Sequence, residues 1–464
     1  MRMRASAPLL LAAAATAAPL LAAESPPADP AAAVDPEIAQ MVSGVSAERI
    51  QRSIFVLASF KTRHTLSDPL PSGDGIGGAM AWIRAEFGRA SAEAGGRLAV
   101  ELDTFDQPPE PPRFPQGAQI TNVVATLPGT EAGPQGRTLV VSAHYDSRAT
   151  NPLDAASAAP GADDDASGTA AVLELARVMS HFKFRATIVF IAFSGEEEGL
   201  YGSAHWARAA RAGNADIEAV LNNDIIGSSR SERGEVDRRT VRLFAQGVPP
   251  VPAPADAQLA MEREGGENDT PPRELARAIR EIAAAYLPAF RVEIVYRADR
   301  YLRGGDQLPF LERGYAAVRF TEPAEDYRHQ HQNVREADGV KYGDTPERLD
   351  FAYVADVARV NAAALAVLAR APAPPRGVQV EAARLENDAT LRWEPEADPG
   401  SAGHRIVWRD TTSAAWEHAM DVAKGVTRAT VRGVSKDNVV FGVEALDAEG
   451  HASPAVFPEA RRTL

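Results

Sequence analysis

The chain has 464 residues, which is too long for one ordinary domain and long enough for a large hydrophobic core. Its formal net charge of -14 argues against nucleic acid and anionic membranes as partners, and such acidity serves solubility. There is no cysteine, so disulfides, thiol nucleophiles and cysteine-ligated zinc are excluded. Any metal must therefore be held by His, Asp and Glu.

The first 23 residues have the organisation of a secretory signal peptide. Arg2 and Arg4 precede an apolar run that ends in small residues near Ala22 and Ala23. Because this run is short, rich in alanine and interrupted by proline, a transmembrane anchor is the weaker interpretation. The sequence therefore predicts export, with a secreted or periplasmic location after removal of residues 1–23.

A Pro/Ala-rich leader over residues 24–37 is predicted to be flexible, and strands then alternate with helices as far as residue 371. Strands are predicted over 97–105, 120–129, 138–147, 186–193, 217–227 and 316–323, and helices over 46–60, 75–90, 167–182, 202–212, 271–287 and 351–370. Ser167 is a candidate N-cap for its helix. This alternation predicts an α/β sandwich built on a largely parallel sheet.

The pattern changes at a Pro-rich linker over residues 372–377. Beyond it, residues 378–464 contain short strands and turns, with Trp393 in an early strand. This texture predicts a small β-sandwich. The stretch "DNVVFGVEALDAEGHASP" resembles the last strands of fibronectin type III modules, and the region has no recognisable catalytic constellation.

Acidic residues and histidines follow the predicted strands between residues 138 and 331. Each group has an ordinary interpretation, such as a helix cap or a solvated face. Together they are predicted to lie at one edge of the sheet, where a pair of divalent cations would offset their repulsion. The residues are His144, Asp146, Asp163, Asp164, Asp165, Glu196, Glu197, Glu198, Asp224, His329 and His331.

Four stretches, "SAHYDS", "PGADDDASGTAAVLELARV", "FSGEEEGLYGS" and "NNDIIG", are similar in order and spacing to motifs of the two-zinc aminopeptidases. These are secreted bacterial leucyl-type enzymes related to glutamate carboxypeptidase, and the resemblance covers roughly residues 115–370. It implies a three-layer zinc-exopeptidase sandwich with a mostly parallel central sheet over residues 24–371. It also implies two Zn²⁺ per chain.

The resemblance further implies a role for each site residue. Glu196 would be the general base, and Asp146 would orient the imidazole of His144. The peptide bond between Asp164 and Asp165 would be cis. The metal ligands would be His144, Asp164 as the bridge between both ions, Glu197, Asp224 and a late histidine.

The late histidine is either His331 or His329. Members of the family have an Asp four residues after this histidine, whereas Asn333 and Arg335 stand at those positions here. Asp344 would take that part if the intervening residues are an insertion. His331 is favoured because a Gln-His pair precedes the spacer in many secreted members.

The implied reaction is hydrolysis of the N-terminal bond of peptide substrates, by a metal-bridging water that Glu196 activates. Tyr301, Arg303 and Asp306 occupy the segment that carries substrate-pocket residues in the family. One alternative is a carboxypeptidase, in which Arg303 would bind the substrate carboxylate. Others are a glutaminyl-cyclase-like enzyme and a non-catalytic binding protein that acts through the C-terminal module.

Overall fold

The protein is described here by a computed structural model that covers residues 34–131, 136–248, 255–396 and 398–461. The predicted signal peptide lies outside these residues. The helices are α1 (Pro36–Ser43), α2 (Ala47–Ser59), α3 (Ile76–Glu93), α4 (Ala166–Met179), α5 (Glu196–Gly199), α6 (Tyr201–Ala212), α7 (Ala255–Glu264), α8 (Pro271–Tyr286), α9 (Leu308–Leu311) and α10 (Phe351–Arg370), with 3-10 turns η1 (Gly266–Asn268) and η2 (Pro346–Arg348).

The larger part of the chain is built on an eight-stranded mixed sheet of order β1-β2-β4-β3-β5-β8-β6-β7. The four central strands β4, β3, β5 and β8 are parallel, whereas β1, β2 and the pairing of β6 with β8 are antiparallel. The strands are β1 (Ala99–Gln107), β2 (Ala118–Leu127), β3 (Thr138–His144), β4 (Thr187–Phe193), β5 (Ile217–Asn223), β6 (Thr240–Ala245), β7 (Arg291–Val295) and β8 (Ala317–Thr321). Parallel pairing thus joins the four central strands and also joins β6 to β7 at one edge of the sheet, and β6 and β7 were not predicted.

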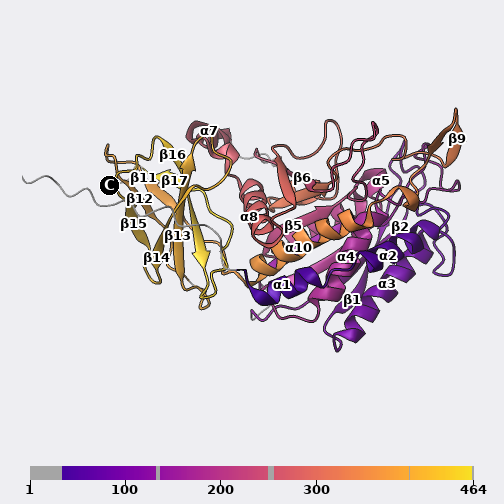
Figure 1. The fold of residues 1–464 in the computed structure, drawn as a ribbon, viewed down its shortest axis with the longest axis horizontal. Helices are drawn as coiled ribbons and strands as arrows, with labels where there is room; N and C mark the ends of the chain where they lie inside the picture. Colours follow the sequence, from indigo (N-terminus) through magenta and orange to yellow (C-terminus); the bar gives the residue numbers. More distant parts are fainter. Residues whose placement is uncertain (1–33, 132–135, 249–254, 397, 462–464) are drawn as a thin grey trace, which may run out of the picture.

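Helices cover both faces of this sheet (Figure 1). Successive residues of a strand point to opposite faces, and Val140 and Val141 accordingly belong to two different hydrophobic cores. The larger core contains α2, α3, α4, α8 and α10, and the smaller one contains α6 and α9. These layers hold the central strands rigid up to their carboxyl ends.

Two local predictions were wrong. The N-cap of α4 is Asp165, whose carboxylate accepts the backbone N–H of Gly168, while Ser167 lies inside the first turn. The predicted leader already contains the start of α1, because Asp35 caps the helix and Pro36 occupies its first position.

The C-terminal part contains two sheets around one core, which is the arrangement of a β-sandwich. One sheet has the order β15-β12-β11-β17 and the other β14-β13-β16. Trp393 and Leu391 from the first sheet pack with Ile406 and Phe441 from the second. The strands are β11 (Gln379–Glu381), β12 (Ala389–Arg392), β13 (Gly403–Asp410), β14 (His418–Ala423), β15 (Arg428–Val431), β16 (Val439–Leu446) and β17 (Glu459–Arg461), and a separate ribbon joins β9 (Arg335–Ala337) to β10 (Val340–Tyr342).

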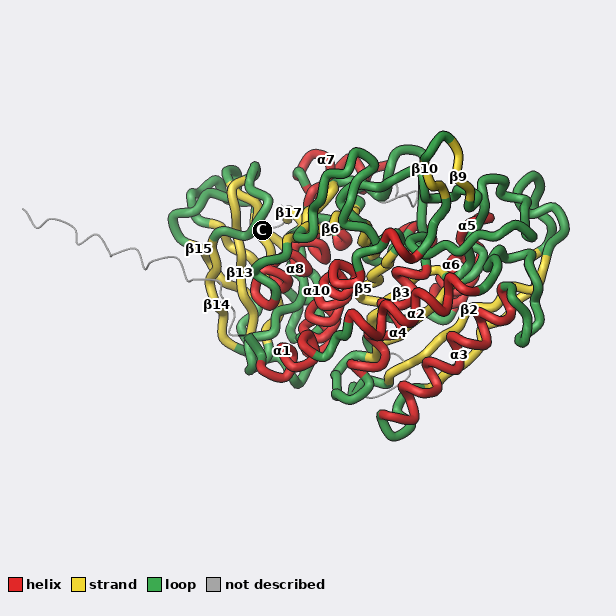
Figure 2. Tube along the Cα trace, turned by 45° about the vertical axis from the view of Figure 1, so that its right-hand side comes forward, coloured by secondary structure: helices red, strands yellow, loops and turns green. Residues whose placement is uncertain are grey.

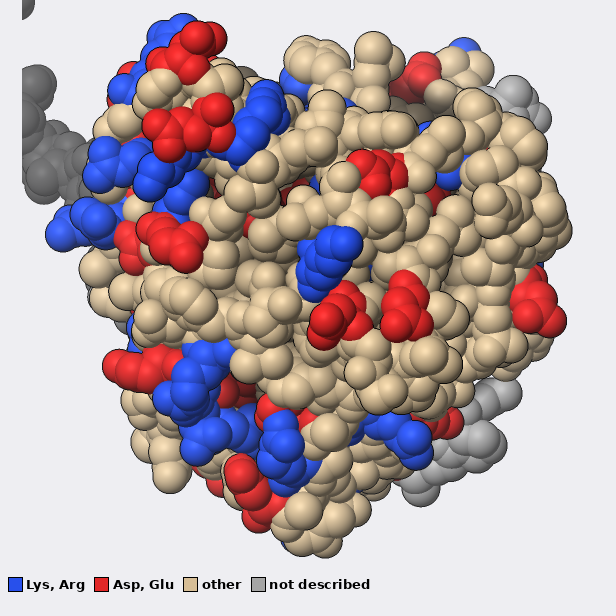
Figure 3. Space-filling model, turned by 90° about the vertical axis from the view of Figure 1, so that its right-hand side faces the viewer, with Lys and Arg blue, Asp and Glu red and all other residues tan. Residues whose placement is uncertain are grey.

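The β-sandwich and helix α5 lie at opposite ends of the molecule (Figures 1 and 2). On the face at the α5 end, acidic and basic side chains lie beside one another along one side, and much of the rest is uncharged (Figure 3). That face therefore lacks, among the described residues, the continuous basic area typical of nucleic-acid binding.

Among the described residues, α10 alone has the length and apolar composition of a membrane span, and most of it is buried inside the protein.

A buried ionic cluster joins the two parts of the chain. His451, after β16, places Nδ1 2.6 Å from Asp447 Oδ2 and Nε2 3.2 Å from Asp35 Oδ2. Asp35 is also paired with Arg370 at the end of α10, at 2.7 Å. Burial lowers the pKa of His451, but the two aspartates outweigh it, so the pKa lies above its usual value.

We expect His451→Gln to lower the free energy of unfolding by roughly 1–3 kcal/mol, because the replacement loses charge-assisted hydrogen bonds. A raised histidine pKa contributes stability that is full below the unfolded value of about 6.5 and is lost as the pH rises through the folded value. The deficit should therefore be larger at pH 6 than at pH 9 in urea unfolding. The exposed His181, changed to Gln, is the matched control, and an equal deficit at both pH values would contradict the pairing.

Candidate metal centre

The carboxyl ends of the central parallel strands bring the candidate ligands to one edge of the sheet. His144 is the last residue of β3, Asp224 follows β5, and Glu196 and Glu197 begin α5 directly after β4. Two loops, one before α4 and one after β8, complete the site. Such an edge is where open α/β folds place their ligands, since the strands end there together.

Asp164, in the loop before α4, faces two imidazoles with its two carboxylate oxygens. Its Oδ1 lies 3.1 Å from His144 Nε2, and its Oδ2 lies 2.8 Å from His331 Nε2. Asp224 Oδ1 is 3.8 Å from the first imidazole, and Glu197 Oε1 is 3.0 Å from the second. Because ligand atoms around one tetrahedral zinc lie roughly 3.3 Å apart, these distances match two adjoining ligand groups that share Asp164.

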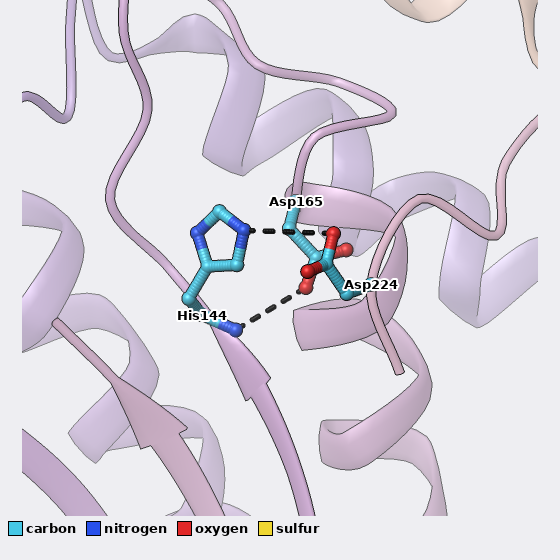
Figure 4. Close-up of side chains that lie close together, drawn as sticks. All are labelled: His144, Asp165 and Asp224. Atoms are coloured by element: carbon cyan, nitrogen blue, oxygen red, sulfur yellow. Dashed lines mark hydrogen bonds and ion pairs between the residues drawn. The ribbon is translucent and has the colours of Figure 1, made fainter. Parts of the chain in front are cut away.

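Asp165 lies next to the first group but its oxygens serve the backbone. Ligand atoms of His144, Asp165 and Asp224 come within 4.8 Å of one another. Yet Asp165 Oδ2 accepts the backbone N–H of His144 at 3.2 Å, and its Oδ1 caps α4. Figure 4 shows the imidazole directed at Asp224, while the backbone nitrogen faces Asp165. The bond between Asp164 and Asp165 is cis, as the resemblance implied.

The structure brings His331, and not His329, to the ligand groups. His329 is turned toward its own loop, with Nδ1 3.0 Å from the carbonyl oxygen of Gly343 and Nε2 3.3 Å from Asp326. The choice between the two histidines therefore rests on the path of the loop after β8, which the sequence pattern did not specify.

The three consecutive glutamates have three different environments. Glu197 faces His331. Glu198 is buried, where Thr65 donates a hydrogen bond to it at 2.5 Å and burial raises its pKa to about 8. Glu196 is half-buried, and its side chain has no hydrogen bond or ion pair with any residue that the structure describes. Its carboxylate is thus free to act on a bound molecule.

Asp146 contacts both ligand groups. Its Oδ1 lies 3.6 Å from Nδ1 of His144, and its backbone oxygen lies 3.2 Å from the same nitrogen. Its Oδ2 accepts the backbone N–H of Glu197 at 3.0 Å. This position fits the predicted role, because a partner on the distal nitrogen fixes the orientation of a metal-binding imidazole.

Burial and mutual repulsion dominate the electrostatics of the site. Burial, with Asp224 and Glu197 nearby, raises the pKa of Glu196 well above its usual value, although His144 acts against this rise. Burial lowers the pKa of His331, but Glu197 and Asp164 raise it to about 9. Metal ligation requires neutral imidazoles, so protons and a metal ion compete for the same nitrogens.

The comparison with known proteins agrees with this geometry. The family model of peptidase family M28 matches residues 122–345, which contain both ligand groups. A "Probable zinc metalloprotease" of Pyrenophora tritici-repentis is 45% identical over 425 residues, or 91% of this chain and 87% of that protein. One of the same name from Leptosphaeria maculans is 45% identical over 426 residues, or 92% and 97% of the two chains. The chain belongs to peptidase family M28.

Two solved structures have the same fold. LapA of Legionella pneumophila has a TM-score of 0.50 at 18% identity, with 72% of this chain and 76% of that chain covered. LapB of Legionella pneumophila also has a TM-score of 0.50, at 19% identity, covering 71% and 74%. At such low identity the likeness concerns the fold of this family M28 protein alone.

Zinc, the metal of this family of metalloproteases, fits the residues of the site. Nε2 of His144, Nε2 of His331 and Oε1 of Glu197 are buried and face other candidate ligand atoms at 2.8–3.1 Å, yet none makes a hydrogen bond of suitable geometry with a described residue. Leaving such atoms unpaired is costly in the absence of a ligand. Imidazole nitrogens and carboxylate oxygens are zinc ligands, so the unpaired atoms and the donor set agree.

The three predicted substrate residues lie at different depths. Asp306 is fully buried, and burial raises its pKa to about 7. Arg303 is exposed, and its Nη1 lies 3.4 Å from the side-chain oxygen of Gln330, whose amide donates to Asp164 at 3.2 Å. Tyr301 is 80% exposed on the same loop. Arg303 is thus connected to the carboxylate of Asp164 through Gln330, whereas Tyr301 lies nearer the surface.

Two charged residues that fix the Asp164 loop were not assigned this role from the sequence. Arg63 is buried and donates to the carbonyl oxygen of Gly161 at 2.8 Å. The carboxylate of Asp344 accepts the backbone N–H groups of Asp163 and Asp164, both at 2.8 Å. Neither residue has a local signal, because each acts on a segment far away in the sequence.

Arg319 is a third missed residue, and here a signal was available. It lies within β8, is fully buried, and places Nη2 3.0 Å from Asp224 Oδ1 and Nη1 2.8 Å from Asp299 Oδ2. An arginine in a buried central strand requires buried acidic partners. The stretch "AAVRFT" therefore indicated an ion pair at this position.

We expect His331→Gln to lower zinc affinity by more than about 100-fold, the upper end of the cost of losing a supporting residue alone. His329→Gln is the matched control and should retain wild-type zinc content, because Gln can still donate to Gly343. The measurement is bound zinc per chain after dialysis at fixed free zinc, with circular dichroism to verify folding. Equal losses in the two variants would contradict the assignment of His331.

Proposed function

We propose that this zinc metallopeptidase is a two-zinc aminopeptidase that removes the N-terminal residue of peptides. The observation that carries the proposal is Asp164, which presents one oxygen to His144 and the other to His331. A single carboxylate between two ligand groups is the arrangement of a two-metal site. Asp224 completes the first group and Glu197 the second, as the resemblance to two-zinc aminopeptidases implies.

In this proposal Glu196 is the general base. Zinc, when bound, supplies Lewis acidity that polarises a carbonyl and makes water more acidic. Glu196 takes a proton from the attacking water and passes it to the leaving amine. Its half-buried, unpaired carboxylate and its raised pKa suit both transfers. Asp146 holds the imidazole of His144 in place.

The charge of the site supports a substrate with a free amine. Glu196 and Asp306 are carboxyl groups that are not ligands in this proposal, and Asp306 is one of the groups that raise the pKa of Glu196. A protonated N-terminal amine would be attracted to these carboxyl groups. Removal of one residue at a time follows from recognition of that amine.

Arg303 supports a second candidate, a carboxypeptidase. Its exposed guanidinium lies beside Gln330, which contacts Asp164, so a substrate carboxylate could pair with it close to the metal centre. A glutaminyl-cyclase-like enzyme, which works with one zinc, is less well supported because two ligand groups are present. A non-catalytic binding protein is disfavoured because Glu196 and every ligand group are in place.

Export and the C-terminal module belong to the same proposal. We propose that residues 1–23 direct secretion or transport to the periplasm, which N-terminal sequencing of the exported protein would test. The described part of the fibronectin type III-like region (residues 378–464) lies at the end of the molecule opposite α5 (Figure 1). This distance supports a role in docking, attachment or folding and not in the reaction.

Glu196→Gln should retain zinc and lose turnover of leucyl-p-nitroanilide by about 10²–10⁴-fold, the usual worth of a general base. Zinc content and turnover are to be measured on the same preparations, so that loss of the base is separated from loss of metal. Wild-type enzyme with N-acetyl-leucyl-p-nitroanilide is the substrate control and should show little turnover.

Different failures have different meanings. Turnover of N-blocked peptides with a free C-terminus, but not of free-amine substrates, would favour the carboxypeptidase. A mutant that retains zinc and full activity would remove Glu196 from the mechanism.

A further inference from the structure

A cavity of about 260 Å³ adjoins the metal centre. Asp164 forms part of its wall. The wall also includes the residues next in the chain to three of the candidate ligands, namely Asp163, Ile225 and Gln330. A group bound in the cavity would therefore contact the segments that carry three of the candidate ligands.

Ile225 separates Asp224 from the cavity in an unusual conformation. Its φ angle is 60°, a left-handed value that is rare for a β-branched residue. Its backbone N–H lies 3.4 Å from Asp165 Oδ1, and its carbonyl oxygen accepts the N–H of Glu322 at 2.8 Å. The wall between ligand and cavity is thus held by hydrogen bonds on both sides.

The cavity has more acidic than basic side chains. Apart from Asp164, six acidic residues line it against two arginines. The acidic residues are Asp163, Glu322, Glu325, Asp326, Asp344 and Glu347, and the arginines are Arg230 and Arg348. An occupant with positive charge is therefore favoured.

Four of these carboxylates, those of Asp163, Glu322, Asp344 and Glu347, lack an arginine partner among the described residues, and Asp163 and Asp344 accept backbone N–H groups instead. Glu325 is paired with Arg300 at 2.7 Å, and Asp326 is paired with Arg328 at 2.6 Å. Glu322, by contrast, is only 1% exposed and accepts the backbone N–H of Ser228 at 2.6 Å. Glu347 is exposed at the surface. Glu322 also hydrogen-bonds to the side chain of Asp163, so the wall holds a buried acidic pair and an exposed carboxylate that no arginine neutralises.

The arrangement suits an elongated organic cation better than a metal ion. A hard cation needs several oxygens that converge at 2.0–2.6 Å on one point. Of the cavity's acidic residues, Asp164 alone belongs to a convergent group of three potential ligands in the described part of the chain. The cavity is also far larger than an ion, and its carboxylates without an arginine partner lie at different depths.

We propose that this cavity binds the cationic side chain of an N-terminal lysine or arginine, with Glu322 and Glu347 as the residues that select the charge. The inference rests on the proposed aminopeptidase function. An N-terminal side chain branches from the carbon next to the scissile carbonyl, so its pocket must adjoin the metal centre. The shared wall at Asp164 meets that requirement.

The test compares lysyl- with norleucyl-p-nitroanilide, whose side chains differ by the terminal ammonium group, on the zinc-loaded enzyme. Wild type should favour lysine in kcat/KM. Glu322→Gln should lower the lysine-to-norleucine ratio about ten- to hundredfold, the worth of a charge-assisted hydrogen bond. Gln retains an acceptor for Ser228, and the ratio corrects for any general loss of activity.

Glu347→Gln alters only an exposed residue and should lower the same ratio by a smaller factor. Glu312→Gln, at an exposed glutamate paired only with Arg313, is the matched control and should leave the ratio unchanged. If Glu322→Gln does not fold, Glu347→Gln decides the question.

Failure of this inference differs from failure of the proposed function. Turnover of neither substrate by the wild type would remove the aminopeptidase and the inference with it. Turnover of both, with a ratio that neither variant changes, would overturn the inference alone. An equal loss on both substrates in Glu322→Gln would also overturn it, because the residue would then bind the amine common to both.

Discussion

The structure depends on the concentration of buried carboxylates at one edge of the central sheet. Asp164, Glu197 and Asp224 are all nearly inaccessible to solvent, as is Asp146 behind them. Burial of one such charge is unfavourable, and burial of several together adds repulsion. The imidazoles of His144 and His331 and the guanidinium of Arg319 lie against these carboxylates. Bound zinc would offset the remaining repulsion, and of the three consecutive glutamates Glu197 is the one that faces the ligand groups.

A site of this charge density needs a rigid backbone, and the surrounding polar groups supply it. Asp344 and Arg63 bind the backbone of the loop that carries Asp164, from opposite ends of the peptidase region. Asp165 joins that loop to β3 through the N–H of His144 and to α4 through its capping bond. Residues that resemble ligands in the sequence thus divide into those that face the site and those that hold its backbone.

The sequence predicted which residues gather at the site, but not which of them bind the backbone instead of facing the ligand groups. Strand ends and motifs predicted the region around His144, Asp164, Glu197 and Asp224, because parallel strands bring their carboxyl ends together. The choice of His331 over His329 depends on a loop path, and the cap of α4 depends on competition between Asp165 and Ser167. Strands β6 and β7 escaped prediction, and so did β14 and β17. β6 is short and almost wholly buried, whereas β7, β14 and β17 are short and partly exposed, and none shows a clear alternation. Long-range partners such as Arg63 have no local signal at all.

Gln330 lies in the wall of the acidic cavity and joins it to Arg303, whose guanidinium lies 3.7 Å from Glu325 of the same wall. The side-chain oxygen of Gln330 faces Arg303, and its amide nitrogen donates to Asp164, while the acidic cavity lies on the side of Asp163. A short peptide is itself polarised, with an ammonium group at one end and a carboxylate at the other. Under the proposed function, the cavity and Arg303 would orient such a peptide with its N-terminal residue toward the cavity and its C-terminal end toward Arg303. The same charges that would select a basic residue would then also set the direction of the substrate across the metal centre.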